Sequence, residues 1–226
     1  MNTLEISKNK LQEIRKAEEY FNALATNIQL SGVDLKVIAI SSVQENEGKS
    51  TTSTNLAVAF ARAGYKTLLV DCDIRNSVMT GIFRSRDKIQ GLTDFLSGRS
   101  QLDQILYATD FPNLDIIESG QVAPNPTGLL QSKNFTVMMD ALEAGAEDMQ
   151  ASDDVFEIYT DPDAFNDVVA ALEGKGYTFL EADVQMVPQN YVKLTDEEDI
   201  KNMEKLIDAL EDNDDVQNVY HNWEQD

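Results

Sequence analysis

The stretch of residues 36–62 constrains the fold of this 226-residue chain more than any other. It opens with a short β-branched run (36–42), passes through a polar loop that ends in Gly48-Lys49-Ser50, and closes with an alanine-rich stretch of helical character. In the order strand, loop, helix, the first backbone N–H groups of the helix and the positive end of its dipole face the loop, where they bind phosphate. The stretch therefore predicts an α/β fold with a P-loop.

The residues of this loop have predicted tasks. The Lys49 ammonium would reach the β and γ oxygens of ATP, and the Ser50 hydroxyl would hold Mg²⁺. Backbone N–H groups around them would surround the phosphates. The predicted cofactors are thus ATP and Mg²⁺, and the predicted cofactor-binding residues are Glu47, Gly48, Lys49, Ser50 and Thr51.

The loop departs from the usual pattern at one position. A glycine is usual five residues before Gly48, and this chain has Val43 there. Asn46 is expected to supply a left-handed turn instead, because asparagine tolerates positive φ better than most residues. The alternative is that Gly48-Lys49-Ser50 only starts a helix after a strand.

Two aspartates lie at the carboxyl end of the next apolar run, which spans residues 64–70 and is typical of a buried strand. In an open parallel sheet the ligand lies at the carboxyl ends of the strands, so Asp71 and Asp73 would sit beside the phosphates. One would take a hydroxyl proton and the other would hold Mg²⁺. The alternative is that both only cap a turn, and Cys72 between them is expected to pack into the sheet. The predicted catalytic residues are Lys49, Asp71 and Asp73, and the predicted metal ligands are Ser50 and Asp73.

The formal charge of −22 is concentrated in the C-terminal part of the chain. Residues 1–139 hold 15 acidic and 14 basic residues, whereas residues 140–226 hold 25 acidic and 4 basic residues. Such a break indicates either a change of domain or an acidic, solvated surface.

Sequence patterns in this acidic part predict the order β-α-β-β-α-β, that of a ferredoxin-like sandwich. Asp161-Pro162 is a helix cap followed by proline in the first turn, and residues 195–198 form a capping box. The predicted fold class is therefore an α/β, incomplete P-loop sheet followed by an α+β ferredoxin-like domain. The expected strands are residues 156–160, 179–187, 191–194 and 216–220, and the expected helices are residues 161–172 and 195–210.

Five stretches of the first part carry a resemblance: residues 23–29 (ALATNIQ), 47–57 (EGKSTTSTNLA), 63–77 (AGYKTLLVDCDIRNS), 91–98 (GLTDFLSG) and 124–135 (PNPTGLLQSKNF). They resemble the cytoplasmic bacterial tyrosine kinases that regulate capsular and exopolysaccharide synthesis. The resemblance implies a fold similar to that of ParA/MinD-type ATPases and an ATP-dependent kinase acting on tyrosines. It implies Lys49 and Ser50 as phosphate and Mg²⁺ ligands, and Asp71 and Asp73 as catalytic aspartates. It also implies self-association and activation by a membrane-anchored adaptor protein.

Three departures from that family bear on activity. The family's assembly motif has Glu followed by Arg three and six residues on, where this chain has Glu19, Asn22 and Ala25. An apolar strand that ends in aspartate follows the helix after Phe135 in the family and is missing here, and so is the C-terminal tyrosine cluster. Residues 155–161 imitate that strand too late in the chain, so we do not assign its role to Asp161. We therefore expect impaired catalysis.

Three stretches of the second part, residues 141–148 (ALEAGAED), 183–189 (DVQMVPQ) and 205–222, resemble the C-terminal part of YebC-type transcriptional and translational regulators. The basic N-terminal domain of that family is not part of the match. Because 25 acidic residues stand against 4 basic ones over residues 140–226, this part should repel phosphate backbones, and nucleic-acid binding is not expected.

The chain thus has the pattern of a fusion, with a P-loop tyrosine-kinase-like nucleotide-binding domain in residues 1–138 and an acidic YebC-like domain in residues 139–226. A continuous helix over residues 127–144 is expected at the junction. A parallel sheet that lacks strands leaves apolar surface open, so exposure or disorder is expected around residues 76–120 unless the second part covers them.

Three functions remain open from the sequence. The first is an ATP-binding, kinase-like enzyme, the second a regulatory interaction module with a vestigial nucleotide site, and the third an inactive chimera. A single cysteine, no secretory leader and no apolar run long enough for a bilayer favour a cytoplasmic location. The resemblance adds association with a membrane through a partner protein.

Overall fold

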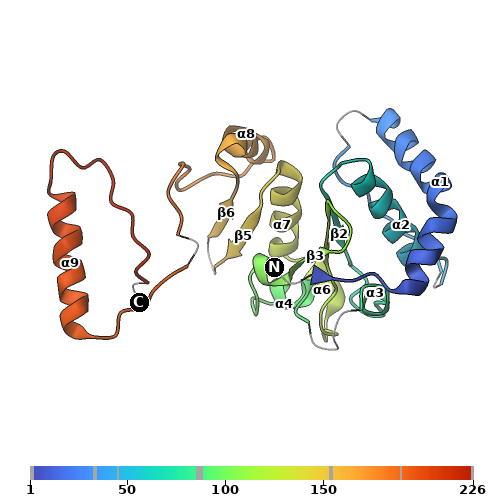
Figure 1. Cartoon of the computed structure of the whole chain (residues 1–226), viewed down its shortest axis with the longest axis horizontal. Coiled ribbons are helices and arrows are strands. Elements are labelled where there is room, and N and C mark those ends of the chain that lie inside the picture. Colours follow the sequence, from blue (N-terminus) through green and yellow to red (C-terminus); the bar gives the residue numbers. More distant parts are fainter. Residues whose placement is uncertain are drawn as a thin grey trace. The chain divides into compact units, whose positions relative to one another are not determined.

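The chain forms two compact units in the computed structural model, residues 1–178 and residues 179–226, which are described separately (Figure 1). The structure describes residues 3–32, 35–44, 46–84, 89–152, 155–188 and 190–224. The change in charge near residue 140 lies inside the first unit.

A four-stranded sheet forms the centre of the first unit. Its strands are β1 (Thr3–Leu4), β2 (Thr67–Val70), β3 (Leu106–Thr109) and β4 (Leu114–Ile117), in the spatial order β1-β3-β4-β2. The pairs β2–β4 and β1–β3 are parallel, and β3–β4 is antiparallel. The predicted α/β class with an incomplete sheet is therefore confirmed, as a mixed rather than an all-parallel sheet.

Two long helices pack on one face of this sheet. Helix α1 (Lys8–Ser31) lies along α2 (Lys49–Arg62), and the short α3 (Met79–Ile82) lies beneath them (Figure 1). Leu69 of β2 points toward this side, and its neighbours Leu68 and Val70 pack toward the other, as the two-residue period of a strand requires. The buried cluster on the helix side comprises Ile6, Ile14, Ala57, Val58, Ala61, Leu69, Met79, Phe83, Tyr107, Leu114 and Ile116.

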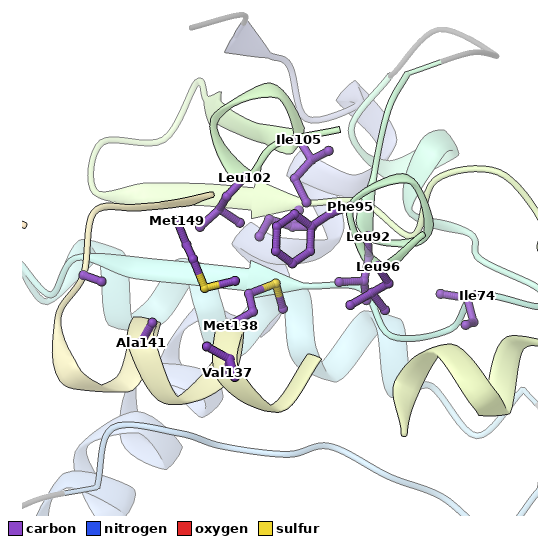
Figure 2. Close-up of a cluster of buried hydrophobic side chains, with 12 residues drawn as sticks. Ile74, Leu92, Phe95, Leu96, Leu102, Ile105, Val137, Met138, Ala141 and Met149 are labelled. Atoms are coloured by element: carbon purple, nitrogen blue, oxygen red, sulfur yellow. The ribbon is translucent and has the colours of Figure 1, made fainter. Parts of the chain in front are cut away.

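The opposite face is covered by the helices α4 (Leu92–Leu96), α5 (Leu102–Ile105), α6 (Pro126–Leu130) and α7 (Lys133–Ala144). Figure 2 shows the cluster of buried side chains here, with Met138 of α7 and Met149 of a following strand beside Phe95. Ala141, Ala146 and Met149 come from the acidic part of the chain, so that part supplies cover for residues 89–120. Residues 85–88 of the stretch expected to be exposed lie outside the described residues.

The junction helix predicted over residues 127–144 is wrong, because two helices occupy it. Helix α6 ends at Leu130, and Ser132 caps a new helix, since its side chain accepts a hydrogen bond from the Phe135 N–H group. A serine cap offers the backbone a better partner here than continuing the helix does.

A hairpin and a helix complete the first unit. Strands β5 (Asp148–Ala151) and β6 (Phe156–Tyr159) pair antiparallel, and the 3-10 turn η1 (Pro162–Ala164) leads into α8 (Phe165–Gly174). The Asp161 side chain accepts a hydrogen bond from the Asp163 N–H group, which confirms the predicted helix start. Strand β6 and helix α8 agree with the strand and helix predicted over residues 156–160 and 161–172, whereas β5 was not predicted.

The strand predicted for residues 36–42 does not form. These residues carry no strand pairing, and Val37 and Ile38 are 43% and 39% exposed. Strand β2 ends the sheet and pairs only with β4. An extended run is stable in a sheet only where a neighbour completes its hydrogen bonds, and no such neighbour lies beside this run in the described residues.

The second unit holds one helix, α9 (Glu197–Glu211), within the residues that the structure describes. Asp196 caps it, one residue after the predicted start of the capping box, by accepting from the Glu198 and Asp199 N–H groups. The strands predicted at 179–187, 191–194 and 216–220 are absent there apart from a single bridge between Val192 and Trp223. No residue of α9 is buried, so these segments lack the packed face that would hold a sheet together.

Candidate phosphate-binding site

The loop before α2 has the backbone conformation that the sequence predicted. Asn46 has φ 60° and Gly48 has φ 89°, so both lie in the left-handed region. The prediction that Asn46 supplies a left-handed turn in place of the usual glycine is confirmed. These two positions reverse the chain sharply and start α2 at Lys49.

The N-terminal end of α2 is open. Thr52 donates the first helical hydrogen bond, to the Gly48 carbonyl at 2.8 Å, and no side chain caps the helix. The N–H groups of Lys49, Ser50 and Thr51 have no acceptor among the described residues. Three free donors at the positive end of a helix are a ready site for an anion.

Two charged side chains hold the loop in place. The Lys49 Nζ atom donates to the Ser42 hydroxyl at 3.1 Å, which ties the lysine back to the segment before the loop. The Glu47 carboxylate accepts from the N–H groups of Val43 and Gln44 at 3.1 and 3.2 Å. Two loop amides thus already point at a carboxylate, which shows that the loop can direct its donors to a negative group.

Ser50 and Thr51 differ in availability. The Ser50 hydroxyl has no hydrogen-bond partner within the described residues, so it is free to take a ligand. The Thr51 hydroxyl accepts from the Lys10 ammonium at 3.1 Å, and its carbonyl accepts from Asn55 at 2.7 Å. Of the two, only Ser50 is available as a metal ligand.

Asp71 lies at the carboxyl end of β2 and is only 5% exposed. Its backbone N–H donates to the Ile117 carbonyl at 2.9 Å, which extends the β2–β4 ladder. Its carboxylate accepts from the Ser77 hydroxyl and from the Asp73 N–H group. Burial raises the pKa of Asp71, and hydrogen bonds from Ser77 and Asp73 offset part of that rise.

Asp73 lies in the turn that follows β2 and is half-buried. Its carboxylate accepts from the Asn76 N–H group at 3.1 Å. Both aspartates therefore accept hydrogen bonds within the turn, as expected if they cap it. Asp73 also lines a cavity. That cavity has a volume of about 330 Å³ and is lined by Cys72, Asp73, Ile74, Arg75, Pro126, Thr127, Leu130 and Gln131.

Cys72 is exposed, so the expectation that it packs into the sheet is wrong. In a strand the side chains alternate, and the chain has already left β2 at this position. The crowded surroundings, and then the neighbouring Asp71 carboxylate, raise the pKa of the Cys72 thiol to about 11. A thiol with so high a pKa is a poor nucleophile at neutral pH.

Glu118 and Ser119 are site residues that sequence reasoning missed. They follow β4, and because β4 pairs in parallel with β2, they lie at the same edge of the sheet as Asp71. Glu118 is 2% exposed and accepts from the Thr80 hydroxyl at 3.4 Å. An acidic residue directly after the apolar run of residues 114–117 was the available signal.

Two glycines fix this edge. A Cβ atom added at Gly91 would lie 2.3 Å from the Gly120 nitrogen and 2.4 Å from the Glu118 carbonyl oxygen. Leu92 and Thr93 then donate to the carbonyls of Glu118 and Ser119 at 2.8 and 3.0 Å. The backbone approach that only glycine permits therefore sets where the chain leaves β4.

The predicted residues fall into two groups. Lys49, Ser50 and Thr51 start α2, and Asp71 and Asp73 follow β2; within the described residues no hydrogen bond or ion pair joins one group to the other. Over the same residues, no three His, Cys, Asp or Glu side chains lie close enough to hold a metal ion. A Mg²⁺ ion bound by Ser50 and Asp73 would take its other ligands from phosphate and water, as is usual for this ion.

An open helix start behind a left-handed loop, beside acidic residues at the carboxyl edge of a sheet, defines a P-loop type of nucleotide-binding fold. Two family models match the chain. Residues 35–144 match the AAA domain model, and residues 118–223 match the model of the second and third domain of TACO1/YebC. The two matches share residues 118–144, which include all of α7.

Individual relatives divide the chain in the same way. It is 62% identical over 142 residues to the tyrosine-protein kinase CpsD of Streptococcus pneumoniae, a match that covers 63% of each chain. The corresponding protein of Streptococcus agalactiae is 53% identical over 143 residues, which cover 63% of this chain and 62% of that one. A probable transcriptional regulatory protein of Acetivibrio thermocellus is 59% identical over 87 residues, which cover 38% of this chain and 36% of that one.

Solved structures agree with the kinase match. The chimerical protein CapA2B2 has a TM-score of 0.51 at 32% identity, over 63% of this chain and 65% of that one. The kinase domain of the Escherichia coli tyrosine kinase ETK has a TM-score of 0.51 at 26% identity, over 55% of this chain and 49% of that one. The N-terminal part of the chain therefore matches CpsD-type bacterial tyrosine kinases, and the C-terminal part matches YebC-like regulators. Both resemblances seen in the sequence are confirmed.

The chain spans less than two thirds of the length of these relatives, 63% for the pneumococcal kinase and 36% for the Acetivibrio thermocellus regulator. Over the residues that the structure describes, none of the helices combines the length and the apolar character needed to cross a bilayer.

Proposed function

We propose that the first part of the chain binds ATP and Mg²⁺ as a kinase-like nucleotide site. The observation that carries this proposal is the open N-terminal end of α2, where the N–H groups of residues 49–51 face outward behind the left-handed turns at Asn46 and Gly48. We retain 1–138 as the nucleotide-binding domain and 139–226 as the YebC-like domain.

In this proposal the loop residues hold the phosphates. Backbone N–H groups from Glu47 to Thr51 donate to phosphate oxygens, and Lys49 leaves Ser42 to neutralise the β and γ positions. Ser50 and Asp73 hold Mg²⁺. ATP, when bound, supplies the phosphoryl group. Asp71 accepts the proton of an attacking hydroxyl, a role that its raised pKa favours.

Transfer to tyrosine is expected to be slow. Residues 36–42, which lead into the loop, stand outside the sheet, so strand pairing does not support the loop on this side. Catalysis by phosphate positioning depends on rigid support, and small misplacements cost large factors in rate. A role in capsule or exopolysaccharide synthesis, a membrane-anchored adaptor, self-association and a cytoplasmic location belong to this proposal through the kinase match.

Nucleotide binding is tested by titrating the full chain with a fluorescent ATP analogue, with and without Mg²⁺. We expect saturable binding that Mg²⁺ tightens and that Lys49→Ala weakens by about tenfold or more, because a hydrogen bond to a charged group contributes roughly 1.5–3 kcal/mol. Lys66→Ala is the matched control, an exposed lysine outside the loop. Equal affinity of wild type and Lys49→Ala would show that the loop is not the site.

Transfer is tested with radiolabelled ATP and a tyrosine peptide, or with the protein itself as acceptor. We expect a rate far below that of a CpsD-type kinase of full length, and loss of the remaining signal in Asp71→Asn. A rate equal to that of the full-length kinase would contradict the proposed impairment. Binding without any transfer would leave a nucleotide-binding protein that is not an enzyme.

A regulatory interaction module is the second candidate. The observation that favours it is the YebC match over residues 118–223, together with an excess of 21 acidic over basic residues in 140–226. Such a surface favours a basic protein partner over nucleic acid. Co-sedimentation with RNA or ribosomes should give no signal at physiological salt. Co-sedimentation combined with no ATP binding would favour this function. No co-sedimentation and no ATP binding would indicate an inactive chimera.

A further inference from the structure

A lysine from a different helix is buried at the start of α2. Lys10 lies in the first turn of α1 and is only 6% exposed. Its ammonium donates to the Thr51 hydroxyl at 3.1 Å and to the Glu13 carboxylate at 3.2 Å. Thr51 is the last of the proposed phosphate-binding residues, so a second cation contacts the proposed site directly.

The position of Lys10 is unfavourable without an anion. Lysine is almost never fully buried unless it is paired. The start of a helix carries partial positive charge, which repels an ammonium group. Its carboxylate partner, Glu13, has a side chain that is 62% exposed, and an ion pair with an exposed partner contributes little stability.

Packing explains why the lysine cannot turn away. Ile14, one turn further along α1, is buried in the same hydrophobic cluster as Ala57 and Val58 of α2, so the two helices are packed together beyond Lys10 and Thr51. The Lys10 side chain is buried, and its ammonium is directed at the first turn of α2. The charge is thus placed by the fold rather than by a strong ion pair.

We propose that Lys10 is a positioning and charge-supplying residue of the phosphate site. It holds Thr51 in the first turn of α2, and it adds positive charge that a bound triphosphate compensates. Glu13 attenuates this charge while the site is empty. The proposal rests on the proposed ATP site.

The proposal requires opposite effects from two neighbouring substitutions. Lys10→Met keeps the apolar stem and removes the charge, and should weaken binding of the fluorescent ATP analogue about tenfold, the size expected for one charged hydrogen bond. Glu13→Gln leaves Lys10 with an unopposed charge and should tighten binding by about twofold to threefold. Lys10→Arg should restore affinity to near the wild-type value. Both shifts should shrink as salt is raised.

The control is Lys16→Met, which removes an exposed lysine further along the same helix and should leave affinity unchanged. A thermal melt of each variant separates weaker binding from unfolding. Wild-type affinity in Lys10→Met, or a loss in both Lys10→Met and Glu13→Gln, would overturn the role of Lys10 while leaving the ATP site intact. No binding by the wild type, or equal binding by wild type and Lys49→Ala, would overturn both proposals.

Discussion

At the scale of single residues, Asp71 shows how the proposed chemistry opposes stability. Its carboxylate is buried at the end of β2, and burial is the largest cause that raises its pKa. A carboxyl group whose pKa is raised in the folded state contributes stability below its ordinary pKa of 3.8 and loses it as pH rises through the raised value. At neutral pH the folded protein therefore carries the cost of this buried charge.

Asp71→Asn is expected to raise the melting temperature at pH 7 and to abolish phosphoryl transfer. Asparagine fills the same space without a charge, and functional carboxylates are commonly replaced with a gain in stability. The gain should narrow as pH falls through the raised pKa of Asp71, below which the wild-type carboxyl is protonated. Asp183→Asn, at an exposed position, is the control. A lower melting temperature in Asp71→Asn at pH 7 would mean that the hydrogen bonds from Ser77 and Asp73 outweigh the burial.

At the scale of elements, side chains from α7 and from the turn after α8 form a polar clamp, defined here as Asp140, Glu143, Lys175 and Tyr177. Lys175 donates to Asp140 at 2.6 Å and also to Glu143, and the Tyr177 hydroxyl donates to Asp140 at 2.6 Å. Burial alone would raise the pKa of Asp140. The hydrogen bonds from Lys175 and Tyr177 outweigh this effect, so the net result is a lowered pKa. Burial and the bond to Asp140 raise the pKa of Tyr177 to about 12.

The clamp should lose its effect in acid. A lowered carboxyl pKa gives stability that is present above the ordinary value of 3.8 and is lost as pH falls below it. Lys175→Met should lower the melting temperature at pH 7, and the difference from wild type should shrink at pH 3. Scanning calorimetry at both pH values measures this, with Lys16→Met as the control. An equal difference at both pH values would show that Lys175 acts by packing alone.

At the scale of the whole molecule, two stretches that match different families build one hydrophobic core. Ile74, Phe95 and Ile117 come from the kinase-like part, and Ala141 and Met149 come from the part that matches YebC. Met149 is fully buried against the helices α4 and α5 in this cluster (Figure 2). The first compact unit therefore extends to residue 178 and includes the first two strands of the acidic part.

Met149→Ala should destabilise the first unit by about 2–5 kcal/mol, because truncating a buried side chain leaves a cavity. Met186→Ala is the matched control, since Met186 is 74% exposed, and its effect should stay within about 0.5 kcal/mol. Urea unfolding followed by circular dichroism measures both. Should Met149→Ala unfold like the wild type, the two parts would not share a core.

The sequence was a good guide to features that depend on local chemistry. The left-handed Asn46, the extent of α2 and the cap at Asp161 follow from neighbouring residues alone, and each is observed. Features that need a distant partner were mispredicted or missed. Residues 36–42 form a β-branched run typical of a strand but have no strand neighbour in the described part of the chain, and Glu118 joins the site only because β4 pairs with β2. No local sequence pattern predicts the pairing of β4 with β2.

The shared core has a consequence for how this chain can change over generations. The kinase-like part and the part that matches YebC contact each other around Phe95 and Met149. A substitution on one side selects its compensation on the other, so the parts must drift together. Neither can be exchanged for a homologous segment without refitting the contact. The shared core couples the two parts more tightly than their matches to separate families suggest.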